Sequence, residues 1–266
     1  MRADQTNLLP DAELQDARMS MTPDQYEQEF LCSFEAAIQG AFYGQEMRSL
    51  TDLDRITKVE YNPNYKVSTF WDLGFSDDTT IIFCQIVYGE IRIIDYHSSN
   101  GKSIPFYTGL IDNKPYVYDL HWLPHDARAK TLASGGKSII EQMATKIPLE
   151  KMRIVPSLSL QDGIQAVRMA LLKCWFDADK TEELIECLRQ YQREYDEDKK
   201  VFRDRPRHDW ASHGADAMRM LAIAWKEEVK LVPKEKPIHG LSVGQHNNLT
   251  INEMWKMTPK PRAERY

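Results

Sequence analysis

Three consecutive β-rich segments constrain the fold of this chain more than any other feature of its sequence. The segments are residues 66–72 (KVSTFWD), 79–88 (TTIIFCQIVY) and 90–97 (EIRIIDYH). All three are rich in Val, Ile, Thr, Tyr and Phe, and only short turns around Gly74 and Gly89 separate them. Because such short connections join strands that run in opposite directions, we predict an antiparallel meander of three strands.

After the meander, predicted helices alternate with short predicted strands. Helices are expected at 102–112, 137–145, 161–176, 181–195 and 211–228, and strands at 116–121 and 152–155. In two of the helices, 161–176 and 181–195, apolar residues recur every three or four positions. This order predicts an α/β fold in which helices flank a mixed central sheet, with the antiparallel meander joined to parallel strands.

Charge and apolar periodicity divide the chain into three expected parts. Residues 1–60 contain twelve acidic and five basic residues, and only 22–39 shows helical periodicity. We interpret 1–60 as an acidic leader or linker, with packing as an outer helix as the alternative. Residues 61–230 contain the predicted strands and most of the predicted helices and form the main domain. Residues 231–266 contain four prolines and show no sustained periodicity, which predicts an extended tail with a basic end.

The composition argues against membrane and secreted classes of protein. No stretch approaches the roughly 20 apolar residues that a bilayer span requires, and the N-terminus lacks the apolar core of a secretory signal. The four cysteines form no CxxC pair, which is typical of buried thiols in a reducing compartment. We therefore expect a cytoplasmic protein with no membrane partner.

Aspartates at the ends of predicted strands are the first candidates for chemistry. Asp72 ends the first strand beside a turn that contains Asp77 and Asp78. A carboxylate there is costly to bury without a cation or hydrogen-bond donors, although a turn-forming role is the common alternative. Asp126 follows a later strand, where capping a turn is the alternative role, and Asp119 inside that strand is a competing candidate.

The segment HDWASHGADAMR contains a further group of candidates. Asp209, His213 and Asp216 are separated by four and three residues, which places them on one face of a helix. Asp216 lies in a run of small and apolar residues, so we expect it to have a partner inside the fold. The alternative is that Asp209 caps the helix and Asp216 pairs with Arg219.

Carboxylates from widely separated segments are the ligands that hard divalent cations require. Mg²⁺ and Mn²⁺ prefer oxygen ligands and leave positions open for water and phosphate. Two such ions about 3.5–4 Å apart stabilise both the attacking and the leaving oxygen of a phosphodiester displacement. The pattern therefore predicts metal-dependent phosphoryl chemistry. The segment 134–138 (SGGKS) lacks the first glycine of a phosphate-binding loop, so we expect no nucleotide-binding loop.

A basic cluster precedes the Asp216 segment. Its members are Lys199, Lys200, Arg203, Arg205 and Arg207. With Asp204 they give residues 199–207 a net charge of +4, and the alternating pattern VFRDRPRHDW predicts a hairpin arm. Such an arm can lie on a DNA phosphate backbone, and a solvated loop is the alternative.

Several motifs together resemble the nuclease domain of the large terminase subunits of tailed bacteriophages and prophages. They are WDLGFSDDTT, LPHDARAKTL, QDGIQAVR, CWFD and HDWASHGADAMR, and they cover roughly residues 60–230. The piece QEFLCSFEAAIQGAFYG also resembles the segment that joins the packaging ATPase to the nuclease. The resemblance implies a ribonuclease H-like fold and a Mg²⁺- or Mn²⁺-dependent endonuclease, with two ions, that cuts concatemeric DNA during viral genome packaging.

The same resemblance implies roles for individual residues. Asp72, Asp126 and Asp216 would be the catalytic, metal-binding triad, Asp78 a further metal ligand, and His213 an accessory catalytic group. The implied partners are double-stranded DNA, the small terminase subunit, the portal or procapsid and the packaging ATPase domain, in the cytoplasm of a bacterial host.

The chain departs from the full-length large terminases in one respect. It contains no Walker motifs, so we expect an excised domain or a truncated gene product and assign no motor activity to it. One rival function is that of another ribonuclease H-like enzyme, such as a resolvase or transposase. The other is a non-catalytic module that docks on the portal or capsid.

Overall fold

The computed structural model describes residues 10–20, 40–74, 77–130, 136–196 and 198–231. The chain divides into two units, Met1–Lys226 and Glu227–Tyr266, and the second is described only to residue 231. The helix expected at 22–39 and nearly all of the expected tail therefore lie outside the described residues. None of the described helices combines the length and apolar character needed to cross a membrane.

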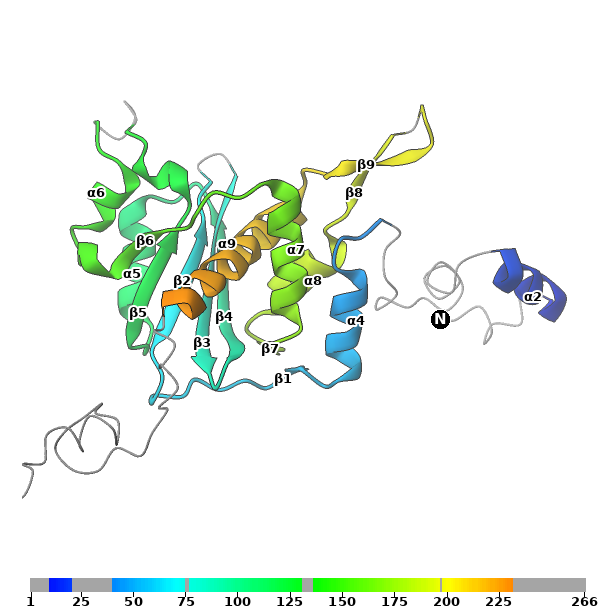
Figure 1. The fold of residues 1–266 in the computed structure, drawn as a ribbon, viewed down its shortest axis with the longest axis horizontal. Coiled ribbons are helices and arrows are strands. Elements are labelled where there is room, and N and C mark those ends of the chain that lie inside the picture. Colours follow the sequence, from blue (N-terminus) through cyan, green and yellow to red (C-terminus); the bar gives the residue numbers. More distant parts are fainter. Residues whose placement is uncertain (1–9, 21–39, 75–76, 131–135, 197, 232–266) are drawn as a thin grey trace, which may run out of the picture. The chain divides into compact units, whose positions relative to one another are not determined.

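A seven-stranded mixed sheet forms the centre of the first unit (Figure 1). Its strands are β1 (Ile56–Thr57), β2 (Val67–Asp72), β3 (Asp78–Val87), β4 (Glu90–Asn100), β5 (Tyr118–Leu123), β6 (Met152–Ile154) and β7 (Cys174–Asp177). They lie in the order β1-β7-β4-β3-β2-β5-β6. β3 pairs antiparallel with β2 and β4, and the other four pairs are parallel. The predicted α/β fold, with a ribonuclease H-like mixed sheet, is therefore confirmed.

The turn between β3 and β4 fixes the register of the meander. Tyr88 and Gly89 form a two-residue connection in which both residues have positive φ, 52° and 83°. Two positive φ values in succession are typical of a type I′ turn, whose twist matches that of the strands it joins. Val87 and Glu90 accordingly face each other at the start of the ladder.

Helices cover both faces of the sheet. The helices of this unit that flank it are α4 (Gly44–Asp52), α5 (Ile104–Asn113), α6 (Ile139–Met143), α7 (Leu160–Leu171), α8 (Glu182–Gln190) and α9 (Trp210–Leu231). Residues of α4, α7, α8 and α9 share one hydrophobic cluster with Phe70 and Ile82, whereas those of α5 and α6 share a second with Trp71 and Ile81. Neighbouring residues of one strand thus face opposite cores, as the two-residue period of a strand requires.

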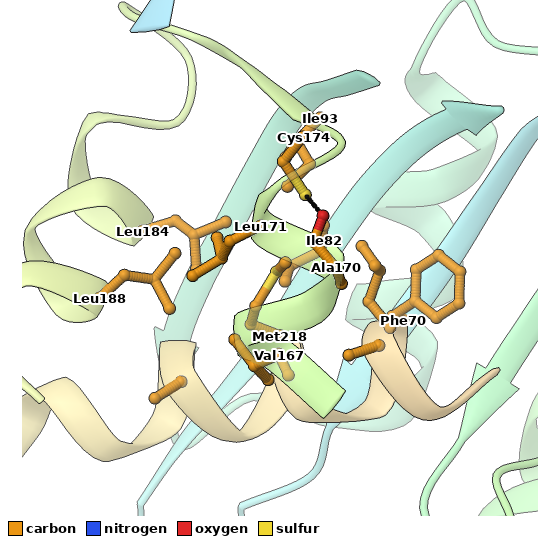
Figure 2. Close-up of a cluster of buried hydrophobic side chains, with 14 of the residues drawn as sticks. Phe70, Ile82, Ile93, Val167, Ala170, Leu171, Cys174, Leu184, Leu188 and Met218 are labelled. Atoms are coloured by element: carbon orange, nitrogen blue, oxygen red, sulfur yellow. Dashed lines mark hydrogen bonds between the residues drawn. The ribbon is translucent and has the colours of Figure 1, made fainter. Parts of the chain in front are cut away.

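The core beneath α9 is close-packed and apolar. Figure 2 shows a cluster of side chains that includes Phe70 and Ile82 of the sheet, Val167 of α7, Leu188 of α8 and Met218 of α9. Each of these side chains is at most 1% exposed. Burial of one such side chain contributes about 1.5–3 kcal/mol, so this layer holds α9, the helix that contains Asp216, firmly against the strands.

Two expected helices end earlier than the sequence predicts. The predicted helix 161–176 ends at Leu171, and the last part of it forms β7, where Cys174 pairs in parallel with Ile91 of β4. The predicted helix 181–195 ends at Gln190. Beyond these ends Cys174 and Tyr191 are buried and continue the apparent helical period although the backbone there is extended, whereas Tyr195 is 42% exposed on the strand that follows.

Part of the expected leader packs with the sheet. Met47 and Leu50 of α4 are each 2% exposed and belong to the same cluster as Phe70. Ile56 of β1 pairs with Phe176 of β7 and extends the sheet at its edge. Residues 40–60 therefore contribute to this core.

Candidate metal centre

Asp72 lies at the carboxyl end of β2, an interior strand that runs between β3 and β5. Gly74 and Thr79, which follow β2, are in contact. The Thr79 hydroxyl donates a hydrogen bond to the Gly74 carbonyl at 2.7 Å, and a Cβ on Gly74 would lie 2.7 Å from the Asp77 carbonyl oxygen. Only glycine fits there, and Asp77 and Asp78 are thereby close to Gly74, which follows β2 by two residues.

The N-terminus of α9 is fixed by Asp209. Its side chain accepts a hydrogen bond from the Ala211 backbone N–H at 3.0 Å, and the Arg207 guanidinium lies 3.5 Å away. Asp209 therefore caps the helix, which is the role that the sequence offered as the alternative to a metal ligand.

His213 connects α9 to the end of β2. Its Nδ1 lies 3.7 Å from Oδ2 of Asp72, and its backbone carbonyl accepts a hydrogen bond from the Thr80 hydroxyl at 3.1 Å. Asp72 is the largest cause of a raised pKa for His213, and the charges of Asp78 and Asp77 raise this pKa further. Three carboxylates from the β2–β3 end thus act on one imidazole.

Asp216 lies one helical turn further along the same face of α9. Its carboxylate is 28% exposed and forms an ion pair with Arg219 at 3.0 Å. Burial raises the pKa of Asp216 to about 6, the Arg219 charge lowers it, and the charge of Asp72 raises it. Asp72, His213 and Asp216 are therefore electrostatic neighbours, and we call these three residues the β2–α9 cluster.

Asp119 and Asp126 belong to opposite ends of β5. Asp119 is near the start of the strand and pairs with Lys66 at 3.5 Å, just before β2. Asp126 is exposed in the short 3₁₀ helix His125–Arg128 that follows β5. Because β2 and β5 are parallel neighbours, the carboxyl ends of both strands share one edge of the sheet. Asp126 is therefore on the side of Asp72, and Asp119 is not.

The donor chemistry of this edge fits a divalent cation, but the described side chains do not form a complete set of ligands. Two carboxylates whose charges repel each other supply hard oxygen donors that a cation would neutralise. Among the described residues, however, no group of three His, Cys, Asp or Glu side chains is placed to hold a metal ion. The triad with Asp126 and the role of Asp78 remain predictions.

The basic cluster lies on a hairpin in which acidic residues of one strand pair with arginines of the other. Strands β8 (Arg193–Asp196) and β9 (Val201–Pro206) form a separate antiparallel pair, so the predicted hairpin is present. Arg203 and Arg205 form ion pairs with Glu194, and Arg203 also pairs with Asp196 at 2.9 Å. Both acids precede the segment 199–207, so they could be found only by pairing the strands.

The other basic residues of the cluster are placed differently. Arg207 pairs with Asp209, whereas Lys199 and Lys200 are exposed near the turn of the hairpin. Neither lysine has an ion pair with another described residue. Of the five residues of the basic cluster, the two lysines are thus the ones without an ion pair to another described residue.

Comparison with solved structures shows similarity to large terminases. The large terminase of a thermophilic bacteriophage is 16% identical in one crystal form, with a TM-score of 0.50 over 84% of this chain and 54% of that one. In a second crystal form the same protein is 17% identical, with a TM-score of 0.51 over 83% and 53%.

A lower TM-score of 0.46 relates the chain to the nuclease domain of the P22 large terminase, at 15% identity over 65% of this chain and 89% of that one. No family model matches the chain, and no curated protein matches it. The chain spans about half the length of the thermophilic phage protein. At these identities the comparison shows the fold alone: over the part that it covers, this chain has the fold of a large terminase.

Proposed function

We propose that this chain is the nuclease part of a large terminase, a metal-dependent endonuclease that cuts concatemeric DNA during viral genome packaging. The observation that carries the proposal is the β2–α9 cluster. In this cluster Asp72, at the carboxyl end of β2, lies 3.7 Å from His213, and its charge acts on Asp216 one turn further along α9. Partly buried, mutually repelling carboxylates in such a place are typical of a functional site.

The proposed site binds Mg²⁺ or Mn²⁺, with two ions during cleavage. Asp72 and Asp216 would hold the ions, with Asp126 from the same sheet edge and Asp78 from the start of β3 as further ligands. Bound ions of this kind act as Lewis acids and stabilise the attacking and leaving oxygens of a phosphodiester. No side-chain nucleophile is required.

The protein groups of the cluster have separate tasks in this proposal. Asp216, with a pKa of about 6, is ionised at pH 7 and above and can act as a ligand. His213 is held by Asp72, and its raised pKa keeps a fraction of the imidazole protonated near neutral pH. A protonated His213 can donate a hydrogen bond to a phosphate oxygen while its other side keeps Asp72 oriented.

The proposed DNA contacts are to the phosphate backbone. Lys199 and Lys200 at the hairpin turn would make them first, whereas Arg203, Arg205 and Arg207 would have to leave acidic partners before they could contribute. Contacts of this kind position double-stranded DNA without reading its sequence. Choice of the cutting site would then come from packaging partners: the small terminase subunit, the portal or procapsid and the packaging ATPase domain. The setting would be the cytoplasm of a bacterial host.

The direct test is cleavage of supercoiled plasmid by the purified chain with Mn²⁺, with Mg²⁺ and with EDTA. Asp72→Asn and Asp216→Asn should lower the Mn²⁺-dependent rate by about 100-fold or more, because loss of a partner that only orients a ligand already costs about 10- to 100-fold. Asp119→Asn is the matched control, because this carboxylate lies near the opposite end of β5.

Each outcome assigns a function. Cleavage that survives both cluster substitutions contradicts the proposed mechanism. Strong preference for branched DNA, or strand transfer, indicates a resolvase or transposase. Absence of both cleavage and thermal stabilisation by Mn²⁺ indicates a docking module, because a ligand that binds only the folded state must raise the melting temperature.

A further inference from the structure

Arg219 is enclosed in the protein beside Asp216. It lies three residues after Asp216 on α9, and its Nη1 forms an ion pair with Oδ1 of Asp216 at 3.0 Å. The Arg219 side chain is only 19% exposed. The closest contact of the ion pair joins Nη1 to Oδ1 of the carboxylate.

Gly163 of α7 makes room for this arginine. A Cβ built on Gly163 would lie 2.4 Å from Cδ and 2.8 Å from Cγ of Arg219. The aliphatic part of the arginine therefore lies directly against the backbone of α7. Glycine inside a helix is less stable than alanine, so a close approach of this kind is a physical reason for a glycine at that position.

Tyr191 holds the far end of the arginine. The Arg219 guanidinium forms a hydrogen bond with the Tyr191 hydroxyl, and the tyrosine side chain is 1% exposed. Its ring stacks on Tyr43 with 5.7 Å between ring centroids and 18° between the planes. We call Gly163, Tyr191 and Arg219 the arginine seat.

A simple helix-surface ion pair does not account for the arginine seat. Exposed pairs three residues apart need no glycine on a second helix and no buried tyrosine, and they contribute little to stability. Here three elements fix the position of one guanidinium: α7, the residue after α8, and α9 itself. The guanidinium that is held in this way is paired with the Asp216 carboxylate.

We propose that Arg219 is a positioning residue that holds Oδ1 of Asp216, so that Oδ2 of the same carboxylate is presented to a divalent cation shared with Asp72. This inference rests on the proposed function and adds a residue outside the ligand set. It predicts that metal affinity depends on where the arginine lies, and not only on its charge.

The test measures Mn²⁺ binding to the whole chain by isothermal titration calorimetry, with plasmid cleavage as a second readout. Arg219→Gln removes the ion pair and should weaken Mn²⁺ binding about 10- to 100-fold, as loss of the group that orients a metal ligand does. Arg219→Lys keeps the charge and should recover part of the affinity.

Gly163→Ala tests position without any change of charge. The new methyl group must displace Arg219, so we expect Mn²⁺ binding to weaken several-fold. Gly109→Ala in α5 is the matched control, because a Cβ there meets no atom within 4 Å. Circular dichroism without metal establishes that each variant is folded.

The failures are distinguishable. If the parent binds Mn²⁺ and Asp216→Asn does not, while Arg219→Gln and Gly163→Ala bind as tightly as the parent or more tightly, Arg219 has no positioning role. If the parent itself binds no Mn²⁺, both the proposed function and this inference are wrong. If Arg219→Gln does not fold, the affinities of Arg219→Lys and Gly163→Ala decide the question.

Discussion

Replacement of Asp216 by asparagine should stabilise the metal-free protein at pH 7. Asp216 is ionised at that pH although burial and the charge of Asp72 oppose its ionisation, which is why its pKa is raised from the ordinary 3.8 to about 6. Asparagine keeps the shape of the side chain and an oxygen that can accept from Arg219, but it carries no charge. A ligand carboxylate that awaits a cation is expected to reduce stability in this way.

The magnitude follows from the two pKa values. At 1.36 kcal/mol per pKa unit, the difference between about 6 and 3.8 corresponds to about 3 kcal/mol at pH 7. The side chain is 28% exposed, so we expect a gain of about 1–3 kcal/mol in the free energy of unfolding.

The contribution of Asp216 to the free energy of unfolding depends on pH, and the two pKa values fix the direction of this dependence. Between pH 3.8 and about 6 the folded state binds a proton at Asp216 that the unfolded state has released. Stability from this group therefore falls as the pH rises through that window, and the gain from asparagine should drop to about half when the pH is lowered from 7 to 5.

Urea unfolding of the parent and of Asp216→Asn in EDTA, at pH 7 and pH 5, measures both quantities. Asp119→Asn is the control, because its exposed pair with Lys66 should contribute less than about 1 kcal/mol at either pH. A variant less stable than the parent at pH 7, or a gain that is equal at the two pH values, would refute the reasoning.

Three other substitutions test the packing of α9, the basic arm and the role of Asp126. Gly214→Ala should lower the free energy of unfolding by about 1–3 kcal/mol, measured by urea unfolding, because its new Cβ would lie 2.8 Å from Cβ of Cys187. Lys199→Ala should weaken DNA binding in a salt-dependent fluorescence anisotropy titration more than Arg205→Ala does, since Arg205 is already paired with an acid. Asp126→Asn should change stability by less than about 0.5 kcal/mol, because Asp126 is exposed, yet should lower the Mn²⁺-dependent cleavage rate about 10- to 100-fold; an unchanged rate would remove Asp126 from the site.

The meander could be predicted from the sequence because its signals are local. Each strand is a run of β-branched and aromatic residues, and Gly89 favours a short turn that joins two antiparallel strands. β7 could not be found in the same way. Only two residues separate its four residues from the end of α7, and Cys174 continues the apolar period of the preceding helix as well as it fits a strand.

The candidate site was predictable in part for a similar reason. The spacing of His213 and Asp216 placed both on one face of α9, and the structure brings that face to Asp72. The spacing alone could not distinguish a helix cap from a buried carboxylate, so Asp209 and Asp216 were both candidate ligands. The hydrogen bond from the Ala211 N–H to Asp209 identifies Asp209 as the cap.

The groups that modify the site came from distant segments. Gly163 and Tyr191 contact Arg219 only because α7 and α8 pack on α9. No local sequence pattern predicts these contacts. The same holds for the arm, where strand pairing brings Glu194 opposite the arginines and reduces the charge that the local sequence suggested.

The central claim is that acidic side chains at the carboxyl end of β2 hold divalent cations. A crystal structure of the chain soaked in Mn²⁺, with anomalous diffraction recorded, tests this claim most directly. We predict anomalous peaks within about 2.0–2.6 Å of carboxylate oxygens of Asp72 and Asp216. A crystal at high Mn²⁺ concentration with no peak between β2 and α9, or with peaks only elsewhere on the protein, would contradict the account.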